Sequence, residues 1–306
     1  MTQTHFYPIG KPGQKWGEAE LAEWRKRQVR MRRYAVDVVP RIEALSGRFE
    51  KVQYGKLDYG GESYDLLALK SPNFDPEVPL ALITGGVHGY ETSGVLGALE
   101  FLECHSADFA GQVNLLSVPC VSPWGYERIN RWNFDALDPN RNFFSDSQAS
   151  ESRALIKVVG SFDLPFLMHI DLHETTDSDE SEFRPAKSSR DGEEFKPGLI
   201  PDGFYLVDDA ANPQPEFQAA IIEAVEEVTH IAPPDADNEI IGSPVVAHGV
   251  IQYPLAELGL CGSITRARYT TTTEVYPDSA KTTIEECVKA QMTAVRAALD
   301  YSLKNQ

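Results

Sequence analysis

Short continuous runs of apolar residues recur along the chain, and helix-like patterns separate several of them. Apolar runs of strand length occupy residues 64–70, 79–85, 113–121 and 165–172, and the patterns at residues 203–209 and 269–276 also indicate strands. Apolar residues at helical spacing mark residues 93–105, 215–230 and 283–303. This alternation predicts an α/β fold with a central mixed, mainly parallel sheet flanked by helices.

Two segments depart from this alternation. Residues 16–46 carry spaced apolar residues among many charges, which is typical of a surface helix, and Pro40 should interrupt or end it. Residues 174–203 are polar and bury little apolar surface, so we expect a loop there that could form a wall or lid over a site. There is no internal repeat, and we expect residues 1–306 to form a single catalytic domain.

The charge balance argues against two classes of partner. The chain has 46 acidic and 28 basic residues, and its formal net charge of -18 repels nucleic acid phosphates and anionic lipids. The start of the sequence lacks the basic-then-apolar order of a secretory signal, and no run approaches the roughly 20 apolar residues of a membrane span. We therefore expect a cytoplasmic protein that binds neither nucleic acid nor membranes.

The four cysteines, Cys104, Cys120, Cys261 and Cys287, are widely scattered and contain no C-x-x-C pair. This spacing favours neither a thiolate zinc site nor a disulfide framework. We expect free thiols, most of them buried.

His88 and Glu91 follow an apolar strand within the stretch "TGGVHGYETSG". An isolated H-x-x-E pair is also common in surface turns and helix caps. This pair, however, lies at the carboxyl end of a strand, where open α/β sheets bind ligands, and the glycines around it allow a tight bend. The stretch therefore predicts two metal ligands, and a catalytic zinc site needs a third.

The run "FLMHIDLHETT" contains two candidates for that third ligand, His169 and His173. Alternate residues of a strand share a face, but only His173 lies at the carboxyl end. We expect His173 to be the ligand and His169 to be a hydrogen-bonded core histidine. A helical i, i+4 zinc pair is the alternative, but it lacks the glutamate directly after the first histidine and breaks the strand pattern.

Hydrolysis also requires a proton acceptor and a clamp for developing negative charge. Arg128, Arg131 and Arg141 lie in a turn-rich stretch after the strand at 113–121, where each could bind a carboxylate or form a surface ion pair. Glu274 follows the β-branched run "TTTT". A carboxylate there is either an exposed strand end or part of a site that opens at the end of the strand.

The order of these residues resembles the zinc carboxypeptidase family typified by carboxypeptidase A. The resemblance covers about residues 80–280 and rests on H-x-x-E at 88–91, R-x-N and D-P-N-R-N-F within 131–143, D-L-H at 171–173, and T-E at 273–274. The D-L-H form is also similar to that of the related succinylglutamate desuccinylase and aspartoacylase branch. That branch shares the fold and hydrolyses N-acyl amino acids rather than peptides.

The resemblance implies one bound zinc ion, with His88, Glu91 and His173 as its ligands. It implies that Asp138 orients the first of these histidines by a hydrogen bond. It also implies that Glu274 is the base that activates water.

The same resemblance implies how the substrate is held. Arg131 would polarise the scissile carbonyl, while Asn140 and Arg141 would grip the terminal carboxylate. Tyr253 is the candidate for the tyrosine that covers the substrate.

Together these roles predict a zinc metallocarboxypeptidase that cleaves an amide next to the free C-terminal carboxylate of a peptide. Two alternatives stay open: a deacylase of N-acyl amino acids, and a catalytically silent relative that only binds a ligand or partner.

Overall fold

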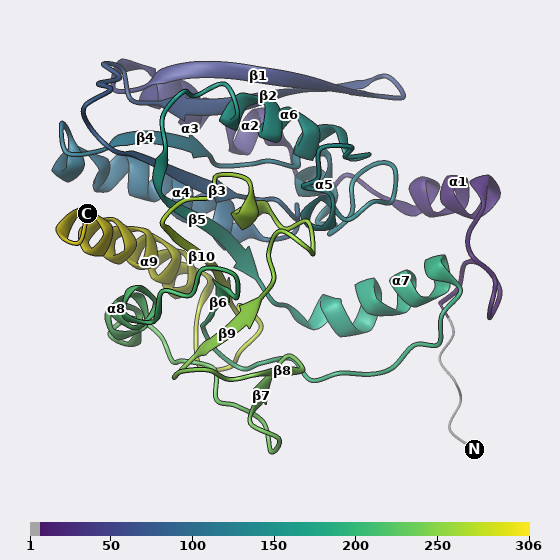
Figure 1. The fold of residues 1–306 in the computed structure, drawn as a ribbon. Coiled ribbons are helices and arrows are strands. Elements are labelled where there is room, and N and C mark those ends of the chain that lie inside the picture. The colour runs from purple at the N-terminus through teal and green to yellow at the C-terminus, as the bar shows by residue number, and fades with distance from the viewer. Residues whose placement is uncertain (1–6) are drawn as a thin grey trace.

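The structure is a computed structural model that describes residues 7–306, so the first six residues of the predicted domain lie outside the described residues. Eight strands form one sheet in the order β1-β2-β4-β3-β5-β10-β6-β9 (Figure 1). They are β1 (Glu50–Tyr59), β2 (Glu62–Lys70), β3 (Leu80–Gly85), β4 (Asn114–Val118), β5 (Phe166–Glu174), β6 (Tyr205–Asp209), β9 (Val250–Tyr253) and β10 (Tyr269–Val275). A separate two-stranded hairpin contains β7 (Glu239–Ile240) and β8 (Ser243–Pro244).

The sheet is mixed, as the sequence predicts. Strand β3 runs parallel to both β4 and β5, β5 runs parallel to β10, and β6 runs parallel to β9. The pairs β1–β2, β2–β4 and β6–β10 are antiparallel. The carboxyl ends of β3, β4, β5 and β10 therefore meet at one edge, where a ligand site is expected.

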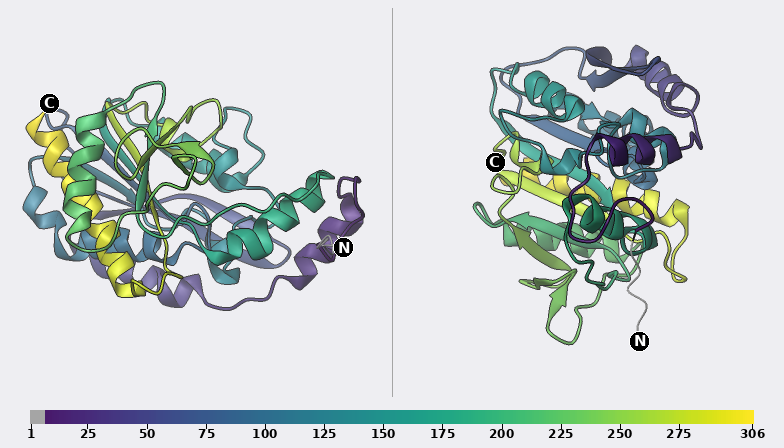
Figure 2. Two further views of the ribbon diagram at one scale, coloured as in Figure 1. Left: turned by 90° about the horizontal axis from the view of Figure 1, so that it is seen from below. Right: turned by 90° about the vertical axis from the view of Figure 1, so that its right-hand side faces the viewer.

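Helices cover the sheet on both faces. They are α1 (Glu18–Arg27), α2 (Tyr34–Asp37), α3 (Val39–Ala44), α4 (Thr92–Cys104), α5 (Pro123–Arg128), α6 (Ser150–Val159), α7 (Arg184–Asp191), α8 (Pro215–Glu226) and α9 (Ile284–Lys304). Helices α8 and α9 pack side by side, and α9 also packs against α4 (Figure 2). The longest helix, α9, begins at a capping box between Thr283 and Glu286, which satisfies two backbone N–H groups at its start.

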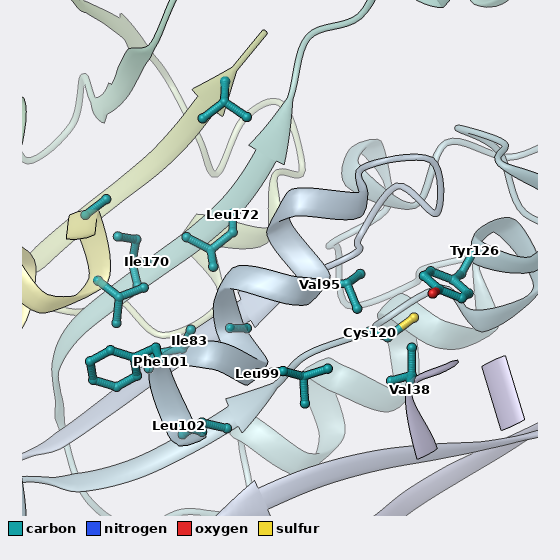
Figure 3. Close-up of a cluster of buried hydrophobic side chains, with 14 of the residues drawn as sticks. Val38, Ile83, Val95, Leu99, Phe101, Leu102, Cys120, Tyr126, Ile170 and Leu172 are labelled. Carbon is teal, nitrogen blue, oxygen red and sulfur yellow. The ribbon is translucent and has the colours of Figure 1, made fainter. Parts of the chain in front are cut away.

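The central strands are buried on both faces, because successive side chains of β3 enter different cores. Ile83 joins Leu172 of β5 and Leu99 of α4 in the larger core (Figure 3). Leu82 joins Leu155 of α6 in the second core. Burial on both faces explains why the parallel strands appear in the sequence as continuous apolar runs rather than as alternating patterns.

Two segments differ from expectation. The segment 16–46 forms three short helices rather than one. One break falls at Val38, between α2 and α3, close to Pro40 as expected, and Pro40 itself lies in the first turn of α3. Proline is tolerated there because the N–H groups of the first turn have no partner within the helix. The sequence patterns also missed β1, whose exposed and half-buried residues give no apolar run, and the short strand β9.

The polar segment 174–203, expected as a loop, contains the end of β5, a π-helical turn (Asp179–Phe183) and α7. Helix α7 is held by the N-terminal segment rather than by a large apolar face. Ser189 donates to the carbonyl of Ile9, and the backbone N–H of Trp16 donates to the carbonyl of Arg190. These partners lie more than 170 residues away in sequence, so local composition does not reveal them.

The four cysteines are free thiols, and all except Cys104 are buried, as the sequence predicts. Among residues 7–306, no helix combines the length and the apolar composition needed to cross a bilayer.

Candidate metal centre

The predicted ligands meet at the carboxyl edge of the sheet. His88 and Glu91 lie in the turn between β3 and α4, and His173 lies near the end of β5. The turn and β5 become neighbours because β3 and β5 pair in parallel, with Gly85 opposite Leu172. Strand pairing therefore brings together residues that are 85 positions apart in sequence.

The turn that carries His88 depends on glycine for two different reasons. Gly86 has a φ of +58°, a conformation that L side chains rarely adopt. At Gly89, an added Cβ would lie 1.9 Å from the carbonyl carbon of Gly125, so only glycine allows this close approach to α5. Arg32 of the N-terminal segment secures the turn by donating to the Gly89 carbonyl at 2.7 Å.

The three ligand side chains are almost completely buried and converge on one point. The Nδ1 atom of His88 lies 2.7 Å from Oε1 of Glu91, and the Nδ1 atom of His173 lies 2.9 Å from Oε2. The two Nδ1 atoms are 3.3 Å apart. Among the described residues, this is the one group of three or more potential ligands, and its donor atoms all lie within 4.8 Å of one another.

Each histidine is oriented by a carboxylate on its far side. Nε2 of His88 lies 2.9 Å from Oδ1 of Asp138, and Nε2 of His173 lies 2.6 Å from Oδ2 of Asp171. These contacts favour protonation of Nε2, which leaves both Nδ1 lone pairs directed at the point of convergence. Asp138 thus lies where the resemblance implies. The sequence analysis gave Asp171 no role, although the alternation in D-L-H places it on the same strand face as His173.

The arrangement fits a zinc ion. Oε2 of Glu91 is buried and has no hydrogen bond, although it lies 2.9 Å from His173. Two lone pairs and a buried carboxylate at such short range repel one another unless a proton or a cation lies between them. A tetrahedral zinc ion with Zn–N bonds of about 2.0–2.1 Å separates two ligand nitrogens by about 3.3 Å, in agreement with the observed 3.3 Å.

The electrostatics of the cluster lead to the same conclusion. Although burial opposes ionisation, His173 and His88 hold the pKa of Glu91 at about 2. Burial also opposes protonation of His173, but Asp171 and Glu91 raise its pKa well above the ordinary value. The cluster therefore attracts positive charge, which a metal ion can supply in place of a proton.

His169 lies deeper in the sheet and is not part of this group. Its side chain is completely buried, and its Nε2 lies 3.1 Å from Oγ1 of Thr84. Burial lowers its pKa to about 4. These are the features of the hydrogen-bonded core histidine that the sequence analysis expects.

Glu274 is the Cα partner of His173 in the parallel pair β5–β10, so both side chains project from the same face of the sheet. Its Oε2 accepts a hydrogen bond of 3.0 Å from Thr175. Burial raises the pKa of Glu274 to about 7, although His173 opposes the shift. A carboxylate with this pKa can both accept and return a proton near neutrality.

Arg131 is held between two carboxylates. Its Nε donates to Asp138 at 3.1 Å, and its Nη1 donates to Asp179 at 3.2 Å and to Tyr90 at 3.1 Å. Nη2 makes no hydrogen bond to any residue within 7–306, and the side chain is 21% exposed. Asp179 was missed by the sequence analysis because it lies in the segment expected as a loop.

Asn140 lies beside His173 and is hydrogen-bonded within the protein. Its Oδ1 accepts the backbone N–H of Cys261 at 2.7 Å, and its Nδ2 lies 3.3 Å from Nε2 of His173. Since Nε2 of His173 donates to Asp171, the Asn140 amide N–H groups do not bond to it, and Asn140 is held through Oδ1 by the segment around Cys261. The neighbouring Arg141 is exposed, and its Nη1 donates to the Asn140 carbonyl at 2.9 Å.

A cleft of about 570 Å³ opens beside the candidate centre. Arg131 and Asp138 line it from the side of the centre, and Arg141 and Tyr253 line other parts of it. Tyr253 ends β9, so the structure brings the candidate covering tyrosine to the same cleft as the candidate carboxylate receptor. Arg128 lies elsewhere and pairs with Glu62.

The fold is similar to those of several solved metallopeptidase structures. A presumed metallopeptidase from Shewanella denitrificans is 20% identical, with a TM-score of 0.62 over 86% of this chain and 88% of that one. A metallo-carboxypeptidase from Burkholderia cenocepacia is 13% identical, with a TM-score of 0.58 over 87% of this chain and 68% of that one. Carboxypeptidase A from Helicoverpa armigera is 12% identical, with a TM-score of 0.57 over 96% of this chain and 75% of that one.

No sequence profile of a protein family matches the chain, and no curated protein matches it either. The structural matches nevertheless show that the chain has the fold of the carboxypeptidase A-like metallopeptidases, with a buried His-Glu-His group at the carboxyl edge of its sheet.

Proposed function

We propose that the protein is a zinc-dependent metallocarboxypeptidase, which cleaves the amide bond next to the free C-terminal carboxylate of a peptide. The observation that carries the proposal is the convergence of His88, Glu91 and His173 on one buried point, with Glu274 on the adjacent strand. The fold supports the same class of reaction.

A zinc ion held by the three ligands supplies a Lewis acid that polarises a carbonyl group and acidifies water. Glu274 accepts the proton of the attacking water and returns it to the leaving amine, a role that its pKa of about 7 suits. Nη2 of Arg131 donates to the carbonyl oxygen as that oxygen gains negative charge. Because Asp138 and Asp179 fix the guanidinium, this donor needs little reorganisation during the reaction.

Arg141 binds the terminal carboxylate of the substrate. Its guanidinium is exposed at the cleft and has no carboxylate partner within residues 7–306. A planar guanidinium can donate two parallel hydrogen bonds to a carboxylate, which makes a free C-terminus part of the recognition.

The proposal is tested by supplying zinc to the metal-free protein and measuring hydrolysis of three substrate sets. The sets are free-acid peptides, the same peptides with C-terminal amides, and N-acyl amino acids. Zinc-dependent cleavage of the free-acid peptides alone is the expected result. Preferential cleavage of the N-acyl amino acids would instead indicate a deacylase, and zinc binding without any hydrolysis would indicate a silent relative.

A further inference from the structure

The cleft beside the candidate metal centre is rich in positive charge. Five cationic side chains line it, against three carboxylates, those of Asp138, Asp179 and Asp191. The five are Arg131, Arg141, Arg184, Lys187 and Arg190. In a chain of formal net charge -18, such a local excess is unexpected for an ordinary surface.

Three of these cations belong to α7 and lie three positions apart, at 184, 187 and 190, so they share one side of the helix. Lys187 and Arg190 share a single lining carboxylate, since Nζ of Lys187 lies 3.2 Å from Asp191 and Nε of Arg190 lies 2.9 Å from it. Glu193 approaches Lys187 only to 3.7 Å, and its side chain is 64% exposed, so it neutralises little. Arg184 pairs with Glu180, which does not line the cleft. Helix α7 therefore contributes three cations and one carboxylate, that of Asp191, to the lining of the cleft.

The wall that carries this charge is fixed in place. The N-terminal segment lies against α7 (Figure 2), where the indole Nε1 of Trp16 donates to Ser189 at 3.1 Å. On the cleft side, Arg190 donates to the carbonyl of Ala136 at 2.7 Å and stacks over Trp132 with its Cζ 4.3 Å from the ring centroid. Because these contacts order the helix before any ligand binds, its cations can bind an anion without a further ordering cost for the backbone.

Lys187 is the most exposed of the three cations of α7. Its side chain is 55% exposed, so it can leave the 3.2 Å contact with Asp191 and reach an anion in the cleft. Arg141, also in the cleft, has no carboxylate partner in the part of the chain that the structure describes. The cleft thus offers two cationic groups on different elements, enough for two carboxylates of one ligand.

We propose that α7 forms a second anion subsite, through which the enzyme prefers peptides that carry an acidic side chain on one of their last two residues. The terminal carboxylate binds Arg141, and the acidic side chain binds Lys187. This inference rests on the proposed carboxypeptidase function and adds the substrate class.

The experiment compares free-acid peptides that differ only in Glu or Gln, first at the last and then at the penultimate position. At one of the two positions, kcat/KM for the Glu peptide should exceed that for the Gln peptide about tenfold, as one charge-assisted hydrogen bond provides. Lys187→Glu should reduce this ratio to about one or invert it. The matched control is Lys157→Glu, which reverses an exposed charge on α6 away from the cleft and should leave the ratio unchanged.

The inference is overturned if Gln peptides are cleaved as well as Glu peptides at both positions, or if Lys187→Glu keeps the full preference. Binding to the zinc-loaded Glu274→Gln variant, measured by calorimetry, separates this result from failure of the proposed function. If no peptide is hydrolysed by the wild type but the Glu peptide still binds about tenfold more tightly than the Gln peptide, the subsite stands and the proposed reaction does not. If the wild type hydrolyses the Glu and Gln peptides equally well, the proposed reaction stands and the subsite does not.

Discussion

The imidazoles of His88 and His173 face each other with their Nδ1 atoms 3.3 Å apart, while the Nε2 atom of each lies against a separate aspartate, Asp138 or Asp171. One histidine comes from a turn and the other from a strand, so neither could be placed relative to the other by local folding. The pairing of β3 with β5 creates their relationship, and the two aspartates determine which nitrogen each ring presents.

Replacement of His173 by alanine should abolish tight zinc binding. The variant loses one of three buried donors, and the two that remain cannot complete a catalytic zinc site. Zinc content after dialysis should fall from about one ion per chain to near zero, and the increase in Tm that zinc causes in the wild type should disappear. His169→Gln is the matched control and should keep its zinc, since His169 bonds only within the core. If only the His169 variant lost zinc, His169 would be the ligand and His173 the core histidine.

Glu274→Gln should keep zinc but lose about three or more orders of magnitude in kcat. The amide is nearly the same size as the carboxylate, yet it cannot accept a proton, so general acid/base chemistry is lost. Metal analysis and steady-state kinetics on the same sample test both parts. Loss of zinc together with activity would make Glu274 a structural or ligand residue. The exposed Glu257→Gln serves as a control that should change neither property.

Asp171→Asn should weaken zinc binding about 10- to 100-fold without removing a ligand. The carboxylate accepts from His173 through Oδ2, at 2.6 Å, and from Oγ1 of Thr84 through Oδ1, at 2.5 Å. Asparagine has an NH2 group at one of these two positions, so one of the two donors loses its acceptor. Competition with a zinc chelator of known affinity measures the change. Asp163→Asn, an exposed substitution just before β5, should have no effect. Unchanged zinc affinity in Asp171→Asn would show that the aspartate does not orient the ligand.

Arg141→Lys should lower kcat/KM for free-acid peptides by roughly 1.5 to 3 kcal/mol of transition-state binding, mainly through KM. Lysine keeps the charge but loses the planar fork that pairs with both oxygens of a carboxylate. Any slow cleavage of the corresponding amidated peptides should be unaffected, because they carry no terminal charge. A neutral effect on free-acid peptides would remove Arg141 from substrate recognition.

His169 should make the fold less stable in acid. Burial lowers its pKa in the folded state from the ordinary 6.5 to about 4. Above pH 6.5 the residue is neutral in both states; as the pH falls from 6.5 toward 4, the unfolded chain takes up a proton that the folded chain does not. Stability is therefore lost over this window, by about 3 kcal/mol in all.

The measurement is the free energy of unfolding in denaturant from pH 7.5 to 4, with chelator present so that zinc does not contribute. His169→Gln should show a shallower decline than the wild type, since glutamine does not titrate. Parallel curves for the two proteins would mean that His169 does not titrate differently in the folded and unfolded states.

The local pattern of apolar residues was sufficient to predict most strands and helices of the central sheet and its cover. Apolar runs predicted β2 to β5, strand-like patterns predicted β6 and β10, and helical spacing predicted α4, α8 and α9. The signal is strongest for the parallel strands β3, β4 and β5, because burial on both faces leaves a nearly continuous apolar run. The position of His88 and Glu91 directly after one of these strands predicted a site at the carboxyl edge, since that rule depends only on strand direction.

The same kind of signal failed where polar partners from distant parts of the chain hold an element. Helix α7 is anchored by Ile9 and Trp16, and β1 pairs with β2 while keeping much of its surface exposed, so neither carries an apolar run. Local composition records how much of a segment is buried, but not which remote groups satisfy its hydrogen bonds.

By itself, the sequence determined the α/β alternation, the H-x-x-E pair at a strand end and the choice of His173 over His169, because each follows from periodicity within one short segment. Only the tertiary structure decided the partners that define the site. It placed Asp171 behind His173, brought the backbone N–H of Cys261 to the side-chain Oδ1 of Asn140, and turned the cations of α7 toward the cleft. These contacts depend on strand order and on side chains that meet across many positions of sequence, and their energies are set by burial and short-range geometry that no local pattern contains.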